Sequence, residues 1–341
     1  MSAVVEPPVA TDAEPRERPR APRRRGLAPA FAFSNVSAIY IWIAVIALFA
    51  WWIPDLFLTT TTAASILNEN AITGLVALSL LVPLAAGVFD LSVGYTLGVA
   101  SVTVAWMVGN GSSPVVAALA ALAIAFVIGL VNATVVVVFK VDSFIGTLAT
   151  GSLLQAAILV ISGNRQMIAG VNTLSPFSSQ AVGPLRWPVL AMFVVALALW
   201  YVMQHTATGR RVYATGQGRE AARLAGIRTE RIRFVSLLVS ATTCGLAGVL
   251  VTALVGAGSP TVGPAYLIPA FAAAFLGATQ FRGGGFNARG TVVAVLLLGT
   301  VATGLALAGV PMWVPYVFTG SVLIGALALG GLKRRRSVEA V

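Results

Sequence analysis

Residues 114–139 read PVVAALAALAIAFVIGLVNATVVVVF, a run of 26 residues without a charged side chain. An α-helix needs about 20 apolar residues to cross the hydrocarbon core of a bilayer, so this run is long enough to span a membrane. The whole chain has the same character, because 58% of its 341 residues are hydrophobic, 10% are charged and the mean hydropathy is +0.91. A soluble domain carries about 25% charged residues and needs a polar surface to cover its core. Lipid is therefore the expected solvent for much of this chain.

Nine further apolar runs lie on either side of this one, each about as long as a membrane span. They cover residues 36–53, 68–88, 92–109, 144–162, 187–204, 232–256, 264–280, 288–309 and 313–331. Glycine and polar residues crowd the ends of the runs 92–109 and 264–280. The sequence thus predicts an all-α, polytopic membrane protein with about ten transmembrane helices.

The basic residues support this count and orient the helices. With a cytoplasmic N-terminus and ten spans, all but two of the 22 lysines and arginines fall in cytoplasmic segments, the exceptions being Arg165 and Arg186. This bias obeys the positive-inside rule. Removing one span before Arg210 would place an arginine-rich loop outside, against the rule. Both termini are therefore expected in the cytoplasm.

Composition divides the chain into a membrane domain and two polar ends. Residues 1–30 are rich in proline, arginine and glutamate and hold too few apolar side chains to fold, which predicts a disordered cytoplasmic tail. Residues 31–332 form the predicted transmembrane domain, with a long cytoplasmic loop at 205–231. Residues 333–341 are expected to be a basic cytoplasmic tail.

Several function classes are excluded by the residues available. The net charge of +11 invites a nucleic-acid reading, but the bases sit in short clusters between apolar runs, so no nucleic-acid partner is expected. The single cysteine, Cys244, cannot form an internal disulfide. The single histidine, His205, cannot build a metal site alone. No phosphate-binding loop or nucleophile elbow occurs, so we expect no catalytic residue, metal or cofactor, and a lipid bilayer as the surroundings.

The cytoplasmic loop contains the stretch from Thr208 to Ile227, TGRRVYATGQGREAARLAGI. Glycines at 216 and 218 suit a turn, and the following residues favour a short helix that Gly226 can cap. The predicted helix comprises Gly218, Arg219, Glu220, Ala221, Ala222, Arg223 and Gly226. Two turns of helix are marginal alone in water, so it would need to dock against this protein or a partner. The residues alone leave open a plain positive-inside loop.

A second feature is Gly87-Val-Phe-Asp-Leu-Ser-Val-Gly94, between two apolar runs. An acid at membrane depth costs about 2.5–3.5 kcal/mol on insertion scales, so Asp90 would face a cavity or a partner. The flanking Gly87 and Gly94 permit a break in the helix, and irregular backbone at membrane depth must line protein or water. One reading is therefore a gate or pathway wall. The other is a connecting turn at the interface, in which Asp90 or Ser92 caps the next helix.

Small and polar residues inside the spans give weaker signals. Gly94 and Gly98 form a GxxxG pattern, which lets helix backbones approach closely. Four polar side chains could line a polar pathway or hold helices together: Asn68, Asn70, Asn132 and Gln155.

Three segments, in order, resemble one family. Gly87 to Gly94 resembles the G-G-I-D-L-S-V-G signature of permease subunits in ABC importers for ribose, xylose and similar monosaccharides. Gly209 to Ile227 is similar to the cytoplasmic loop of those permeases, G-R-x-V-Y-A-x-G-x-N-x-x-A-A-x-x-x-G-I. Ala272 to Gly290 is similar to their A-A-x-x-L-G-G-T-x-x-x-G-G-x-G-x-x-x-G segment. The resemblance is colinear over about residues 60–330.

The resemblance implies a transport mechanism and its partners. Two permease subunits form the pathway, two cytoplasmic ATPase subunits bind their inner loops, and an extracytoplasmic sugar-binding protein delivers the substrate. The helix near Glu220 to Gly226 then becomes the coupling helix, inserted into a groove on the ATPase. The expected location is the bacterial cytoplasmic membrane.

The sequence departs from the family pattern at a few positions, which leaves the substrate open. Val88 and Phe89 replace the usual Gly-Ile, and Gly218 replaces the usual Asn. A permease of the same superfamily for branched-chain amino acids or nucleosides is the first alternative to a monosaccharide permease. The second alternative is a secondary transporter, which would place ionisable residues in its spans, whereas this chain has almost none beyond Asp90 and Glu69.

Overall fold

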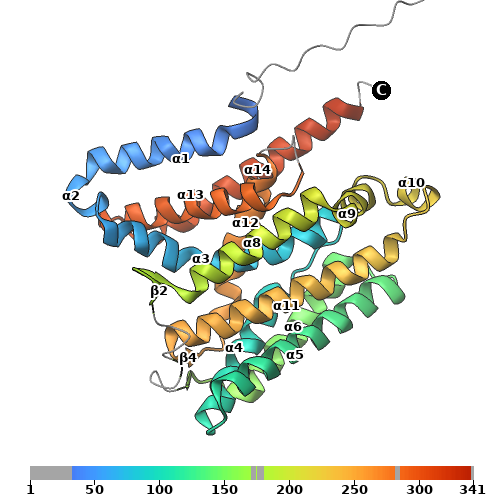
Figure 1. The fold of residues 1–341 in the computed structure, drawn as a ribbon, viewed down its shortest axis with the longest axis horizontal. Helices are drawn as coiled ribbons and strands as arrows, with labels where there is room; N and C mark the ends of the chain where they lie inside the picture. The colour runs from blue at the N-terminus through green and yellow to red at the C-terminus, as the bar shows by residue number, and fades with distance from the viewer. Residues whose placement is uncertain (1–32, 170–173, 175–179, 281–284, 339–341) are drawn as a thin grey trace, which may run out of the picture. The chain divides into compact units, whose positions relative to one another are not determined.

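The computed structural model describes residues 33–169, 174, 180–280 and 285–338, and apolar helices make up most of this part (Figure 1). Six helices are long and apolar enough to cross a membrane: α3 (Thr60–Ala85), α5 (Pro114–Ala133) with the π-helical turn η2 (Thr134–Val138), α6 (Ser143–Ser162), α8 (Trp187–His205), α11 (Thr229–Val255) and α13 (Ala288–Leu307). Four more are apolar over a shorter length: α1 (Phe33–Trp52), α4 (Val93–Gly109), α12 (Val262–Ala278) and α14 (Val314–Val338). The chain is an all-α polytopic membrane protein, as the sequence predicts.

Short elements connect these helices. They are the helices α2 (Pro54–Phe57), α9 (Ala207–Gln217) and α10 (Arg219–Leu224), and the strands β1 (Met167–Ile168), β2 (Gln180–Val182), β3 (Leu185–Arg186) and β4 (Ala257–Gly258). Strand β1 pairs antiparallel with β4, and β2 pairs antiparallel with β3. The β1–β4 pair joins the segment after α6 to the segment after α11, so it holds two distant parts of the chain together.

Each predicted span corresponds to one of the ten apolar helices, but the lengths differ. Helix α3 begins at Thr60 rather than near 68, because the Thr59 hydroxyl accepts a hydrogen bond from the Thr62 amide at 3.0 Å and caps the helix. Helices α4 and α12 have 17 residues each. At a rise of about 1.5 Å per residue they are about 25 Å long, somewhat less than a bilayer core. They are the two runs whose ends are crowded with glycine and polar residues.

Helix α3 lies at the centre of the packing. It contacts α4, α8, α11, α12 and α13, and its Leu75, Leu78 and Leu81 are completely buried. Helices α5, α6 and α8 are peripheral and leave large apolar side chains exposed, such as Leu153 and Val160 of α6. Exposed apolar faces on the outer helices are what contact with lipid requires. The burial therefore separates an enclosed set of helices from a lipid-facing set.

Glycines allow the enclosed helices α4 and α12 to touch through their backbones. A side chain at Gly94 would meet the main chain of Gly263, and a side chain at Gly263 would meet the main chain of Gly94. Gly98, one turn further along α4, also lies against Gly263. The GxxxG pattern read from the sequence thus marks a real close approach, and its partner is on α12.

The connections between helices gather at two ends of the bundle. At one end the Tyr213 hydroxyl of α9 donates a 2.6 Å hydrogen bond to the Phe286 carbonyl, and Arg289 of α13 donates one to Gln204 of α8. At the other end Asn68 bonds the β2–β3 turn through the Pro184 carbonyl. Among the basic residues, Arg210 and Arg211 of α9 and Arg289 of α13 lie at the first end. The predicted tail at 1–30 lies outside the described residues, and α14 continues into the predicted basic tail as far as Val338.

Candidate functional site

The turn between α3 and α4, residues 86–92, is closely packed, with Val88, Asp90 and Ser92 fully buried. Gly87 has φ +73°, a conformation that glycine adopts without the steric cost of a side chain. The Val88 amide then bonds the Pro83 carbonyl at 2.9 Å, which closes the end of α3. Val88 is fully buried against Val137 and Leu237. The helix break that the sequence predicts at Gly87 is therefore present, and it is packed inside protein.

Asp90 is fully buried in this turn and is held by hydroxyl and amide donors. Its Oδ1 accepts hydrogen bonds from the Ser92 hydroxyl at 2.6 Å and the Ser92 amide at 3.1 Å. Its Oδ2 accepts one from the Ser240 hydroxyl of α11 at 2.8 Å. A buried carboxyl group without donors would be costly, so these three bonds let the group stay out of water. The carboxyl group also joins the turn to a helix 150 positions away.

Asn132 extends this network to α5. Its Nδ2 donates to the Ser92 hydroxyl at 2.7 Å, while its Oδ1 is buried without a hydrogen-bond partner in the described residues. Asn132 lies just before the π-helical turn Thr134–Val138. Single π-helical turns inside α-helices are frequent at functional sites. Asn132 thus keeps one unsatisfied polar atom two residues before a π-helical turn.

Helix α6 holds the other side of the turn. The Phe89 amide donates to the Ser143 hydroxyl at 3.1 Å, and the Leu91 amide donates to the Thr147 hydroxyl at 3.0 Å. Ser143 and Thr147 are four residues apart and therefore lie on the same face of α6. The turn is consequently bonded to α5, α6 and α11 at once.

Helix α9 packs directly on the start of this turn. A side chain at Gly216 would meet the Ala85 carbonyl oxygen and the Gly87 amide nitrogen, so the two backbones are in contact there. Thr215, next to it, is buried and donates its hydroxyl to the Arg211 carbonyl. The first half of the predicted cytoplasmic loop is therefore a helix that touches the turn holding Asp90.

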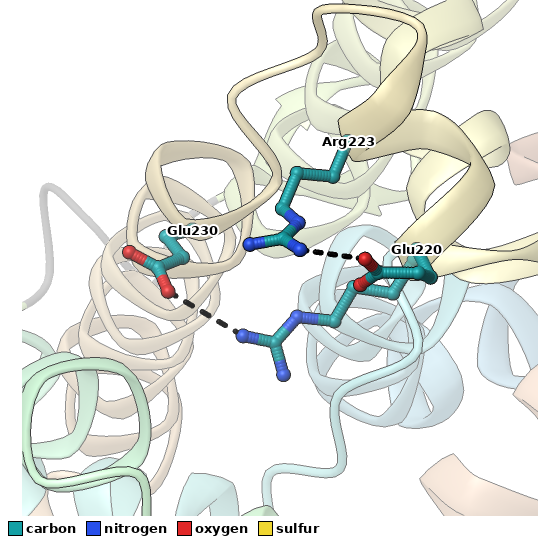
Figure 2. A network of polar contacts seen from close by, with 4 residues as sticks. Glu220, Arg223 and Glu230 are labelled. Atoms are coloured by element: carbon teal, nitrogen blue, oxygen red, sulfur yellow. Dashed lines mark hydrogen bonds and ion pairs between the residues drawn. The ribbon is translucent and has the colours of Figure 1, made fainter.

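Helix α10, the second half of that loop, is exposed. Among its residues only Ala222 is buried, and Leu224 is 81% exposed. Arg223 bonds Glu220 within the helix at 2.6 Å, and Arg219 reaches Glu230 of α11 at 3.6 Å (Figure 2). Exposed ion pairs of this kind contribute about 0–1 kcal/mol, so they orient the helix more than they stabilise it. The helix predicted for docking forms, from Arg219 to Leu224, and presents most of its surface.

The other polar residues predicted for a pathway do not join this cluster. Asn68 bonds the β2–β3 turn, and Asn70 donates to the Ile66 carbonyl within α3. Gln155 donates to the Pro260 carbonyl at 3.3 Å, and its Oε1 is buried without a partner in the described residues. Of the four, only Asn132 lies with Asp90.

Sequence reasoning missed the residues that complete the site. Ser143, Thr147 and Ser240 are hydroxyl side chains in apolar helices, and nothing in the sequence distinguishes them from others of their type. Gly216 was assigned to a turn, whereas it lies inside α9, where its missing side chain permits the contact with Gly87. In the described residues no three His, Cys, Asp or Glu side chains gather to hold a metal ion.

Comparison with known proteins identifies similar chains. Residues 62–327 match the protein family described as branched-chain amino acid transport system / permease component. The ribose import permease protein of Escherichia coli strain K12 is 30% identical over 304 residues, covering 88% of this chain and 94% of the relative. The D-allose transport system permease protein of the same strain is 29% identical over 304 residues, covering 89% and 93%. The fructose import permease protein of Rhizobium meliloti is 31% identical over 312 residues, covering 88% and 86%.

Proposed function

Because this chain belongs to the branched-chain amino acid transport system / permease component family, we propose that it is the permease subunit of an ABC importer for a monosaccharide similar to ribose or xylose. The chain is a multi-pass protein of the bacterial inner membrane and a transport component rather than an enzyme. In the proposal, ATP is hydrolysed on a separate ATPase subunit. An extracytoplasmic binding protein delivers the sugar, and a second permease subunit completes the pathway.

The relatives support the substrate class. Those named above are described as proteins for ribose, allose and fructose, which are all monosaccharides. They cover most of this chain, so the likeness extends over the membrane domain rather than one motif. The substrate of this chain is accordingly proposed at the level of a monosaccharide, with ribose and xylose tested first.

The observation that carries the coupling role is the arrangement of α9 and α10. Helix α10 has one buried residue and an exposed Leu224, as expected of an element that inserts into a partner's groove. Helix α9 connects it to the turn of Asp90 through the contact of Gly216 with Ala85 and Gly87. If an ATPase displaces α10, the movement would therefore pass through α9 to the Asp90 turn by direct contact between the two main chains.

The turn can pass such a displacement to three helices. Ser240 and Asn132 donate hydrogen bonds that connect it to α11 and α5, and the Thr147 hydroxyl of α6 accepts one from the Leu91 amide. Packed helices tend to switch between discrete arrangements rather than deform continuously. We therefore place the Asp90 turn, with Gly87, Ser92 and Gly94, at the junction where ATP-driven motion becomes movement of membrane helices.

Two polar residues are the best candidates for contact with a passing sugar. Asn132 and Gln155 each keep a side-chain oxygen that is buried and lacks a partner in the described residues. A buried acceptor without a donor is unfavourable, and a sugar hydroxyl can supply the donor. Asn68 and Asn70 have main-chain partners and are assigned to holding the structure together.

Uptake by the complete transporter tests the proposal. The chain would be expressed together with a candidate ATPase subunit and a candidate secreted sugar-binding protein, in cells without their own ribose or xylose importers. Uptake of radiolabelled ribose or xylose is expected, with loss when the ATPase lacks its phosphate-binding lysine. Omitting this chain is the matched control for transport by the host.

Two outcomes would contradict the proposal. Uptake of leucine or uridine, with no uptake of any monosaccharide, would assign the chain to the amino acid or nucleoside branch. Uptake that persists without the ATPase and collapses with the proton gradient would identify a secondary transporter.

A further inference from the structure

A cavity of about 880 Å³ lies between α8, α9, the start of α11 and the end of α3. This volume is in the range of about 300–1,000 Å³ that is typical of small-molecule sites. Helix α11 packs mainly against α3, α4 and α5 and touches α8 little, which leaves room between α8 and α11. The cavity is separate from the Asp90 turn and from the residues proposed to meet the sugar.

Away from the arginines, the wall of the cavity is mostly apolar. Its apolar lining includes Leu199 and Val202 of α8, Val235 and Val239 of α11, and Val82 of α3. From Arg228 to Val239 the chain advances about 16 Å along the helix, at about 1.5 Å per residue. Val202 and Val235 are 39% and 46% exposed, so part of this apolar wall is not covered by protein. An apolar surface of this length suits a hydrocarbon chain.

Three arginines line the other end of the cavity. They are Arg211 of α9, Arg228 before α11 and Arg231 on its first turn, and all three are exposed. The ion pairs found in the described part of the chain use Arg219 and Arg223, so none neutralises these three. An excess of positive charge therefore stands at one end of an apolar cavity.

We propose that this cavity binds an anionic phospholipid of the surrounding bilayer, with the phosphate on Arg211, Arg228 and Arg231 and one acyl chain along the α8–α11 wall. Guanidinium groups pair with phosphate oxygens in two-pronged geometry, and basic pockets between membrane helices bind anionic headgroups. An ATPase or a free phosphate ion could reach the arginines from water. Neither would fill the apolar wall as far as Val239, whereas a phospholipid matches both ends.

The position of the lipid site, beside α9 and the junction of α10 with α11, would allow a bound lipid to influence transport. Arg211 lies on α9, the helix that touches the Asp90 turn, while Arg228 and Arg231 lie where α10 joins α11. A lipid held by all three would fix the loop that we propose to receive the ATPase. The binding itself does not depend on which substrate the chain carries, so it can fail or succeed independently of the proposed function.

Native mass spectrometry on the purified full-length chain tests the site. The chain in detergent would be titrated with dioleoylphosphatidylglycerol and, separately, with the neutral dioleoylphosphatidylcholine. Tighter binding of the anionic lipid is expected. The triple variant Arg211→Gln, Arg228→Gln, Arg231→Gln should bind it at least about tenfold more weakly, because each basic residue near a membrane surface contributes about fivefold.

A second triple variant gives the matched control. Arg210→Gln, Arg219→Gln and Arg223→Gln remove the same charge from the same loop, but these residues do not line the cavity. This control should change the affinity less than about twofold. The variant Val235→Trp keeps every charge and fills the wall, and it should also weaken binding of the anionic lipid. If the cavity triple variant aggregates during purification, the Val235→Trp variant is sufficient to test the proposal.

Four results would overturn the proposal. They are equal affinity for the two lipids, equal losses in the two triple variants, full binding by Val235→Trp, and displacement of the lipid by millimolar inorganic phosphate. If the cavity triple variant instead loses its ATPase partner while keeping its lipid, the arginines belong to a protein interface and the lipid site is wrong.

Discussion

Asp90 is an acid that the fold keeps out of water without an ion pair in the described residues. Two serine hydroxyls and one amide supply its hydrogen bonds, and one of those serines comes from a different helix. Removing a partner from a buried polar group costs about 1–3 kcal/mol, more when the group is charged. Small hydroxyl side chains therefore decide whether this turn holds its shape.

Ser240→Ala removes the donor to Asp90 Oδ2, so we expect a lower melting temperature of the purified chain and a loss of about 1–3 kcal/mol of stability. Ser236→Ala is the matched control, because Ser236 is also buried on α11 but donates only to the Arg233 carbonyl of its own helix. Thermal unfolding followed by tryptophan fluorescence checks both.

Asp90→Ala should lower sugar uptake. If this variant keeps wild-type uptake and wild-type yield of the complex, Asp90 serves only to shape the turn.

Gly216→Ala should impair transport although alanine favours helix. The added methyl group would meet the Ala85 carbonyl and the Gly87 amide, so α9 must move away from the turn. Gly218→Ala is the control, since a methyl group there meets only Ala221 at 3.7 Å, an ordinary contact. ATP hydrolysis and sugar uptake should be measured together in reconstituted vesicles. Continued hydrolysis with several-fold lower uptake is expected for Gly216→Ala, and equal uptake in the two variants would refute the contact's role.

The sequence identified Asp90 because it is an isolated acid between two apolar runs. It could not identify Ser240, which is one of several serines and threonines on α11 and lies 150 positions away. A carboxyl group in a membrane span is energetically costly and therefore rare, so it stands out in a sequence. A hydroxyl group fits into an apolar helix because it can bond the backbone of its own helix, so it does not stand out. Asp90 was therefore predictable from the sequence, and Ser240 was not.

At the scale of elements, α10 is short, charged and exposed, and its marginal length makes it dependent on contacts. Arg219–Glu230 is the ion pair that links it to α11 in the described residues, and that pair is exposed at both ends (Figure 2). The helix is thus held loosely by this chain and remains available to a partner.

Leu224→Ser should weaken the association with the ATPase. Leu224 is the large apolar side chain of α10 and is 81% exposed, so a protein groove that covers it gains apolar contact. Ala221→Ser changes the same exposed helix without removing a large apolar group. Recovery of the ATPase on an affinity-tagged permease, measured against the unaltered chain, should drop several-fold for the first variant and stay level for the second. Equal recovery would exclude Leu224 from the interface.

The positions of the membrane helices followed from hydropathy, but their lengths did not. The apolar run near 68–88 predicted α3, yet the helix extends back to a threonine cap that belongs to a polar stretch, TTTTAAS. Glycines 216 and 218 suggested a turn, but α9 continues through Gly216 to Gln217, and its packing on α8, α11 and the end of α3 holds it helical. Tertiary contacts of this kind override local propensity and leave no local trace.

At the scale of the whole molecule, the ten apolar helices of the described residues agree with the spans predicted from hydropathy. The direction of insertion is a separate matter, and the positive-inside rule predicts that the α9–α10 end faces the cytoplasm. The ATPase can reach α10 only with this orientation. The functional proposal therefore depends on the side at which that end lies.

Thiol labelling tests the orientation. Cys244 is the chain's single cysteine and is fully buried, so the unaltered protein should give a low background. Arg165→Cys should react with a membrane-impermeant maleimide in spheroplasts, and Arg210→Cys should react only in inverted vesicles. Both positions are exposed. The reverse pattern would place α10 outside the cell and remove the basis for ATPase docking.

The meeting of Gly216 with Gly87 also restricts how this transporter can change in evolution. At most packed positions, enlarging one residue can be rescued by shrinking its neighbour. Here the atoms that would clash with a side chain at Gly216 belong to the main chain of Ala85 and Gly87, so no smaller neighbouring side chain can make room. A genetic screen for suppressors of Gly216→Ala should therefore return no substitution at Gly87. The second-site changes should instead fall where α9 rests on α8 and α11, because only a shift of the whole helix can reopen the space.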